Sequence, residues 1–310
     1  MSLQPLSRRH FLRYATVPAV LCAQEKEQQP EATFRVEVKV VNLLATVRGP
    51  RGELLRDLGK DDFTVLENGR PQTIRYFARE TDLPLTIGLL IDTSLSQKKI
   101  LDAERGASFR FIDQVLRERK DQMFVMQFDL GILVHQPLTD SRRLLEEALS
   151  QVGTPTRREL EMQTGGGTLL YESVMRSSRD IMAVQTNRKA LIILSDGGEN
   201  GSVATRSEAI EAALRADTLL YSIFFTGGGP DGRENLAVLS RDTGGSYFEV
   251  TRKLPIDKVF AAIQDELRGQ YSIGYVSADP VRISTFRRIQ VTTTRPGATV
   301  QTRGRYWATN

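Results

Sequence analysis

The chain has 310 residues, of which 40% are hydrophobic and 26% are charged, and its formal net charge is +4. This length and composition are typical of a globular protein with a sizeable core, and they argue against a disordered chain. Residues 1–23 carry three arginines and no acidic residue, so their removal would reduce the net charge from +4 to +1. A near-neutral remainder has no domain-wide basic surface, so we expect no nucleic-acid partner.

The first 23 residues are expected to be an export signal rather than part of the fold. Residues 7–13 read SRRHFLR, which resembles the twin-arginine signal of exported bacterial proteins. The apolar stretch at 14–21 is too short to cross a bilayer as a helix, so we expect no transmembrane helix. Cleavage after Ala23 would give a periplasmic or secreted protein. Lipid attachment at Cys22, the only cysteine, and retention in the cytoplasm are the alternatives.

Residues 24–33 are polar and are interpreted as a linker, and residues 34–81 as a small unit of antiparallel strands. Valines at 36, 38 and 40 alternate with charged residues, which is the pattern of a half-buried strand. Further strands are expected at 44–48, 62–66 and 73–78. The last two flank Asn68 and Gly69, a pair typical of a hairpin turn because both residues tolerate positive φ.

Predicted strands and helices alternate from residue 82 to residue 268, which indicates a doubly wound α/β domain. Residues 85–91 are apolar throughout, as in a strand buried on both faces of a parallel sheet. The other strands are expected at 122–128, 132–136, 190–194, 219–225 and 246–250. Only three residues separate 122–128 from 132–136, too few for a crossover helix. The second strand is therefore predicted to be an antiparallel edge strand on a mostly parallel sheet.

A strand pattern returns in the C-terminal segment, residues 269–310, after a last predicted helix at 256–267. Strands are expected at 270–277, 286–294 and 298–306. The most economical arrangement pairs them with those of residues 34–81 in one small β-sandwich, and two separate appendages are the alternative. Residues 281–310 contain six arginines and no acidic residue. We expect a solvated strand face there, with a docking patch for an acidic surface as the alternative.

Three stretches carry oxygen ligands to the carboxyl edge of the predicted sheet, where open α/β sheets bind their ligands. The first is Asp92-x-Ser94-x-Ser96, the second is a glycine loop that ends in Thr168, and the third is Asp196 after the strand at 190–194. Each stretch alone fits a helix cap or a turn. Together they form an oxygen-only set, which suits a hard divalent cation better than zinc.

This set, in this order and on this strand pattern, resembles the von Willebrand factor A (VWFA) domain and its metal-ion-dependent adhesion site (MIDAS). The flanking strands and the arginine pair further resemble VWFA-related proteins of the acidobacterial type. The resemblance implies a Rossmann-like VWFA domain at 82–268 that binds Mg²⁺, with Mn²⁺ or Ca²⁺ as alternatives. It also implies direct metal binding by Ser94 and Ser96 and direct or water-mediated binding by Thr168. Asp92 and Asp196 would act mostly through water.

The function implied is that of an exported binding module rather than an enzyme. Such a module mediates metal-dependent protein–protein interaction or adhesion, and its partner offers an Asp or Glu carboxylate to the metal. A metal-dependent hydrolase is the alternative, but the only histidines are His10, in the signal, and His135, on the predicted edge strand, which leaves no evident Ser-His-Asp triad. A phosphate cradle at glycines 165–167 is a third reading, which lacks the lysine and the spacing of known phosphate loops.

Overall fold

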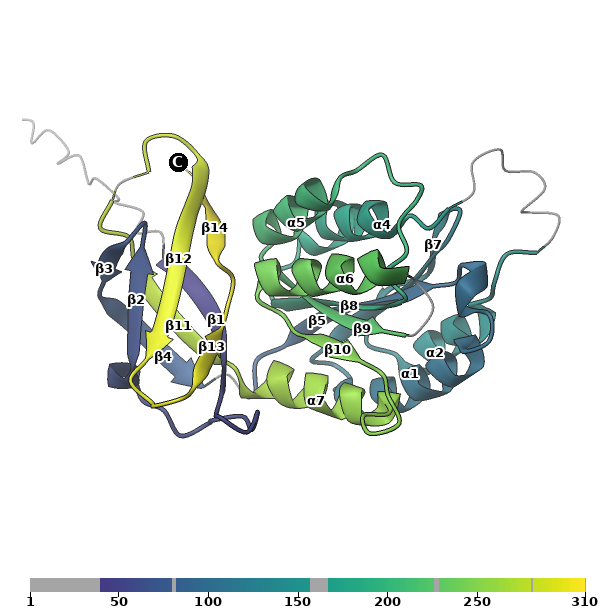
Figure 1. Cartoon of the computed structure of the whole chain (residues 1–310), viewed down its shortest axis with the longest axis horizontal. Coiled ribbons are helices and arrows are strands. Elements are labelled where there is room, and N and C mark those ends of the chain that lie inside the picture. Colours follow the sequence, from purple (N-terminus) through teal and green to yellow (C-terminus); the bar gives the residue numbers. More distant parts are fainter. Residues whose placement is uncertain (1–39, 80–81, 157–166, 226–228, 280, 310) are drawn as a thin grey trace, which may run out of the picture. The chain divides into compact units, whose positions relative to one another are not determined.

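The computed structural model describes residues 40–79, 82–156, 167–225, 229–279 and 281–309. The predicted signal, the linker, the strand pattern before Val40 and the loop residues 164–166 lie outside this part of the chain. Figure 1 shows one sheet with helices on both faces, and a group of strands without helices. The first is a six-stranded sheet, and the second consists of two four-stranded sheets.

The six-stranded sheet has the order β10-β9-β8-β5-β6-β7. Its strands are β5 (Leu85–Asp92), β6 (Gln122–Phe128), β7 (Ile132–Thr139), β8 (Arg188–Ser195), β9 (Thr218–Phe224) and β10 (Tyr247–Glu249). All of them run parallel except β7, which pairs antiparallel with β6 at the edge, as the short connection predicts. Every residue of β5 is buried, as expected of a central strand covered on both faces. The predicted doubly wound, mostly parallel α/β sheet is thus confirmed.

Helices cover both faces of this sheet. On one face lie α1 (Leu101–Val115), α2 (Arg142–Gln151) and α7 (Ile256–Gly269), and on the other lie α4 (Leu170–Arg176), α5 (Arg206–Arg215) and α6 (Gly229–Thr243) (Figure 1). A single turn, η2 (Leu95–Gln97), precedes α1, and a π-helical segment, η3 (Ser177–Met182), follows α4. None of the helices in the described ranges is both long and apolar enough to cross a bilayer.

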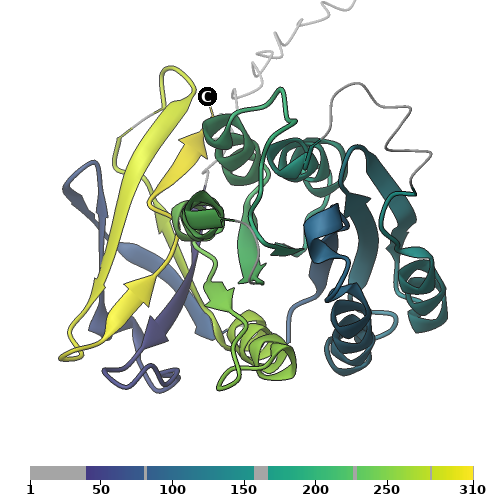
Figure 2. The same cartoon turned by 45° about the vertical axis from the view of Figure 1, so that its right-hand side comes forward.

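The remaining strands form a β-sandwich from segments on both sides of the α/β region. One sheet has the order β13-β1-β11-β4 and the other β14-β12-β2-β3. Early strands pair with late ones, β1 with β11 and β2 with β12 (Figure 2). The strands are β1 (Val40–Arg48), β2 (Phe63–Glu67), β3 (Arg70–Gln72), β4 (Ile74–Arg79), β11 (Tyr271–Val276), β12 (Thr285–Thr293), β13 (Thr299–Gln301) and β14 (Arg305–Ala308), with a short turn η1 (Lys60–Asp62) before β2. Leu43, Tyr275 and Ile289 contribute to the core that the two sheets share.

Three strand predictions in this region differ from the structure, one in its pairing partner and two in their bounds. The hairpin at Asn68 and Gly69 joins β2 to β3, whereas the predicted partner at 73–78 corresponds to β4, which pairs with β11 in the other sheet. The predicted strand at 298–306 is two strands, β13 on β1 and β14 on β12. In both places the chain crosses between the sheets, which an alternating pattern cannot reveal. The strand expected at 44–48 is the second half of β1.

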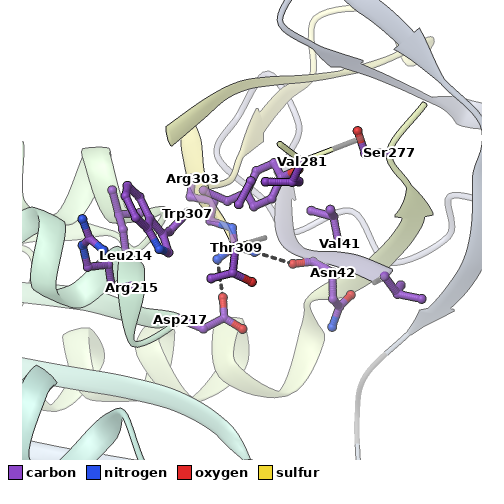
Figure 3. A pocket seen from close by; sticks show the side chains of 13 residues that line it. Val41, Asn42, Leu214, Arg215, Asp217, Ser277, Val281, Arg303, Trp307 and Thr309 are labelled. Carbon is purple, nitrogen blue, oxygen red and sulfur yellow. Dashed lines mark hydrogen bonds and ion pairs between the residues drawn. The ribbon is translucent and has the colours of Figure 1, made fainter. Parts of the chain in front are cut away.

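Side chains of α5 contact the last strand of the sandwich. The Arg215 guanidinium lies 3.4 Å from the centroid of the Trp307 ring, a cation–π contact. Arg303 forms an ion pair with Asp217 and donates a 2.7 Å hydrogen bond to the Asn42 carbonyl (Figure 3). These residues line a pocket of about 390 Å³. Because its charged groups are engaged with one another, we interpret these contacts as structural.

Candidate metal centre

The predicted site residues gather at the carboxyl ends of β5 and β8, which are neighbouring parallel strands. In the sheet, β6 lies on one side of β5 and β8 on the other. The two carboxyl ends therefore flank the point where the strand order reverses, and open α/β sheets bind ligands in the crevice at such a point. Asp92 is the last residue of β5, and Asp196 directly follows β8.

Asp92 is fully buried and is held from two sides. Its Oδ1 accepts a 2.9 Å hydrogen bond from the Ser94 backbone N–H, and its Oδ2 accepts a 2.5 Å hydrogen bond from the Ser195 hydroxyl. Burial, with a contribution from the Asp196 charge, raises the pKa of Asp92 to about 7, although these hydrogen bonds oppose the shift. A cation beside Asp92 would stabilise its ionised form.

The two serines of the first stretch present their hydroxyls together. Ser94 Oγ and Ser96 Oγ lie 3.1 Å apart in the loop between β5 and α1. The η2 turn supports this arrangement, because the fully buried Gln97 directs its Nε2 toward Ser96 Oγ at 3.4 Å. Two neutral hydroxyl oxygens are therefore held together in the same loop that donates a backbone hydrogen bond to Asp92.

Thr168 is buried at the start of α4 and is clamped by the loop after β8. Its N–H donates a 2.6 Å hydrogen bond to Asn200 Oδ1, and its carbonyl accepts a 3.3 Å hydrogen bond from the Asn200 N–H. A Cβ at position 198 would lie 3.1 Å from Asp196 Oδ1 and 4.0 Å from Thr168 Oγ1. Both side-chain oxygens thus lie close to Gly198, which leaves the space beside them free of a side chain.

The glycine directly after Asp196 is required by the backbone. Gly197 has a φ of +73°, and a Cβ there would lie 2.1 Å from the Gly232 carbonyl oxygen, so only glycine fits. The resulting turn lets the Gly198 N–H donate a 2.9 Å hydrogen bond to Asp196 Oδ1. The Asp196 carboxylate is thereby fixed at the strand end.

Sequence reasoning did not single out three residues that position these ligands: Ser195, Asn200 and Asp129. Asp129 Oδ2 accepts a 2.6 Å hydrogen bond from the Thr93 hydroxyl, and its carbonyl accepts a 3.0 Å hydrogen bond from the Leu169 N–H. It therefore holds the serine loop and the threonine loop together. A signal was present, because Asp129 lies in the short turn after a buried strand and Ser195 directly precedes Asp196.

The donor set fits a hard cation. It consists of hydroxyl and carboxylate oxygens, the ligands that Mg²⁺ and Ca²⁺ prefer, and neither Asp92 nor Asp196 has an ion-pair partner among the described residues. In the described ranges, no three His, Cys, Asp or Glu side chains are close enough together to hold one ion. A cation here would therefore depend on the hydroxyls and on water as well.

His135 lies on β7, where its Nε2 is 2.9 Å from Gln127 Oε1.

The sequence matches no protein-family model and no curated protein. Solved structures similar to this chain include proximal thread matrix protein 1 from the mussel byssus, with 13% identity, a TM-score of 0.52, and coverage of 65% of this chain and 51% of the mussel chain. A second structure of that protein, with a zinc-occupied MIDAS motif, has 12% identity, a TM-score of 0.51 and coverage of 66% and 50%. A von Willebrand factor type A protein from Catenulispora acidiphila has 14% identity, a TM-score of 0.48 and coverage of 89% and 76%.

These comparisons concern the fold alone, because the identities are low. The chain spans about half the length of the mussel protein. The likeness to that protein, together with the strand order of the central sheet, supports the VWFA fold that the sequence motifs resemble.

Proposed function

We propose that this chain is an exported interaction module that binds a partner protein through a divalent cation in a VWFA domain at residues 82–268. The ion would be held at a MIDAS formed by Asp92, Ser94, Ser96, Thr168 and Asp196. One observation carries the proposal: the paired hydroxyls of Ser94 and Ser96 adjoin a buried Asp92 that has no ion-pair partner in the described residues.

Each side chain has a distinct part in this proposal. Ser94 and Ser96 bind the ion without neutralising its charge, and Thr168 approaches from the opposing loop. Ser195 fixes the orientation of Asp92, as outer hydrogen-bond partners of metal ligands commonly do. The bound ion would supply a Lewis-acidic position for an Asp or Glu carboxylate of the partner. Mg²⁺ is proposed because the donors are oxygen only; the zinc in the mussel MIDAS supports divalent binding at such a site.

A hydrolase is less well supported than a binding module. Metal-assisted hydrolysis usually needs a general base near the ion. His135, on β7, is hydrogen-bonded to Gln127 on β6, and no hydrogen bond or ion pair in the described residues links it to the five proposed ligands. We therefore infer that the site binds a partner rather than turning over a substrate.

The double variant Ser94→Ala/Ser96→Ala tests the proposal by calorimetric titration with Mg²⁺ and by capture of partners from the exported protein fraction. We expect wild type to bind Mg²⁺, and to capture a partner that is released by EDTA and not captured by the variant. The matched control is Ser150→Ala/Ser207→Ala, which alters two exposed serines on α2 and α5. Equal Mg²⁺ affinity in the double variant, or a partner that stays bound in EDTA, would contradict metal-dependent docking.

The proposed twin-arginine route requires a separate test, because it concerns residues outside the described ranges. Arg8→Lys/Arg9→Lys is expected to keep the unprocessed precursor in the cytoplasm, whereas Arg13→Lys is expected to be exported. Fractionation and immunoblotting would measure both. Normal export of the double variant would rule out this route without affecting the metal-site proposal.

A further inference from the structure

Glu104 is a further acidic side chain beside the candidate metal centre, and none of the roles above involves it. It lies in the first turn of α1, the helix that follows the loop of Ser94 and Ser96. Glu104 is fully buried, and within the described part of the chain neither Oε1 nor Oε2 has a hydrogen-bond partner. Burial of an ionised carboxylate without a partner is strongly unfavourable, so Glu104 is either neutral or, when ionised, compensated by a nearby cation.

Glu104 lies at the end of α1 that adjoins the candidate metal centre. Long helical side chains lean toward the N-terminus of their helix, and the N-terminal end of α1 adjoins η2 and Ser96. Burial is the main cause of the raised pKa of Glu104, and the charges of Asp92 and Asp196 raise it further. The charges of both aspartates therefore act on Glu104, which lies at the end of α1 that adjoins the serine loop.

A second buried polar atom on the same side of the site also lacks a partner. Gln97 directs Nε2 toward Ser96 Oγ, but its Oε1 has no hydrogen-bond partner among the described residues. Gln97 is the last residue of η2, the turn that leads into α1, and the side chains of Gln97 and Glu104 are both fully buried. Two unsatisfied oxygen groups thus lie on the helix side of the serine loop, where water bound to a cation could satisfy them.

We propose that Glu104 is a sixth member of the metal centre, an outer carboxylate that attracts the cation and binds one of its water molecules from the side of α1. The inference rests on the proposed metal-dependent function. Water mediates the contact, because no three acidic side chains in the described ranges are close enough to ligate one ion together. Glu104 adds its carboxylate to those of Asp92 and Asp196, which strengthens the attraction of the centre for cations and most of all for highly charged ones.

Calorimetric titration of wild type and Glu104→Gln with Mg²⁺ and with Tb³⁺ tests this role. Glutamine keeps the size of the side chain and removes its charge. We expect about tenfold weaker Mg²⁺ binding in Glu104→Gln and a larger fold-loss for Tb³⁺, because the lost attraction scales with the charge of the ion. Glu104→Asp keeps the charge and is expected to retain more of the affinity.

Ser108→Ala is the matched control, because Ser108 is also fully buried on α1 and its hydroxyl also lacks a partner among the described residues. It is expected to bind both ions as wild type does, and thermal unfolding without metal would show that all variants are folded. Three results would overturn the role of Glu104. The first is that Glu104→Gln binds both ions within twofold of the wild-type affinity. The second is an equal fold-loss of affinity for Mg²⁺ and Tb³⁺ in that variant, and the third is the same loss of affinity in Ser108→Ala. The first of these would leave the proposed function intact, whereas absence of Mg²⁺ binding in wild type would reject the proposed function itself.

Discussion

The hydroxyl of Ser195, the last residue of β8, donates a 2.5 Å hydrogen bond to Oδ2 of Asp92, the last residue of β5. The same hydroxyl accepts a 2.8 Å hydrogen bond from the Gly197 N–H. Ser195 therefore joins the ends of the two strands that carry the acidic residues of the site. Because Ser195 binds only Oδ2, Oδ1 of Asp92 remains available to accept the hydrogen bond from the Ser94 backbone N–H.

Replacement of this serine should weaken metal binding without unfolding the protein. In Ser195→Ala, Asp92 loses the partner that fixes its orientation, and we expect about tenfold weaker Mg²⁺ binding by calorimetry. Ser222→Ala is the control, because Ser222 is buried in β9 of the same sheet and is hydrogen-bonded to Ser240. Comparable losses of Mg²⁺ affinity in the two variants would argue against a specific role for Ser195.

Asn200 is predicted to act on the metal centre through Thr168. Asn200→Ala removes the side-chain acceptor of the Thr168 N–H, whose hydrogen bond is 2.6 Å long. The threonine loop is then held less firmly, and we expect Mg²⁺ affinity to fall severalfold with a stability loss of about 1 kcal/mol. Calorimetry and urea unfolding measure the two effects. Unchanged affinity with reduced stability would show that Asn200 serves the fold alone.

Asp121 is predicted to stabilise the α/β domain above about pH 4. Burial alone would raise the pKa of Asp121, but hydrogen bonds from Arg117 and Arg268 outweigh it and lower the pKa to about 2. The folded state therefore favours ionised Asp121, and this stabilisation is lost as the pH falls from about 4 to about 2. Asp121→Asn is expected to reduce the free energy of unfolding at pH 7 by roughly 2 to 3 kcal/mol, because two arginines lose their buried partner.

Urea unfolding between pH 7 and pH 2 measures this effect, and the difference between wild type and Asp121→Asn should shrink below pH 4. Asp102→Asn is the control, because Asp102 pairs with Arg105 on the exposed surface of α1. It should cost less than about 1 kcal/mol. A difference between wild type and Asp121→Asn that stays constant down to pH 2 would contradict the role assigned to the Asp121 carboxylate.

Glu67 is predicted to be the main polar determinant of sandwich stability. Its buried carboxylate accepts hydrogen bonds of 2.6 Å from Arg287, 2.6 Å from Ser277 and 2.7 Å from Tyr275. Glu67→Gln replaces an acceptor with a donor that faces these donors, and it should cost about 3 kcal/mol in urea unfolding. Mg²⁺ affinity should not change, because these residues belong to the sandwich. A cost below about 1 kcal/mol, as expected for a break of the exposed Arg70–Asp279 pair, would contradict this role.

The sequence predicts the strands of the α/β region better than those of the sandwich, and the difference arises at two short connections in the sandwich. The buried strand β5 and the antiparallel connection from β6 to β7 follow from apolar runs and connection length. In the sandwich, Thr73 separates β3 from β4, and residues 302–304 separate β13 from β14. At both points the chain changes sheets. Alternation of apolar residues reports burial on one face, and it contains no information on which sheet provides the partner strand.

At the candidate metal centre, too, some residues could be predicted from the sequence and others could not. The five proposed ligands could be named from the sequence because they form a known spacing, but the side chains that position them could not. Asn200 reaches Thr168 across 32 residues of sequence, and Ser195 reaches Asp92 across 103. Such contacts depend on tertiary packing. Glu104 could not be recognised either, because its position on α1 alone does not reveal that it is fully buried.

The most direct test of the proposed metal site is a crystal of the wild-type protein soaked in Mn²⁺, with anomalous diffraction to locate the ion. We expect one strong anomalous peak at the carboxyl ends of β5 and β8, within ligand distance of the hydroxyls of Ser94 and Ser96. The peak should be lost in Ser94→Ala/Ser96→Ala. Absence of a peak at this position in crystals of wild type at millimolar Mn²⁺, or an undiminished peak in the double variant, would contradict metal binding at these residues.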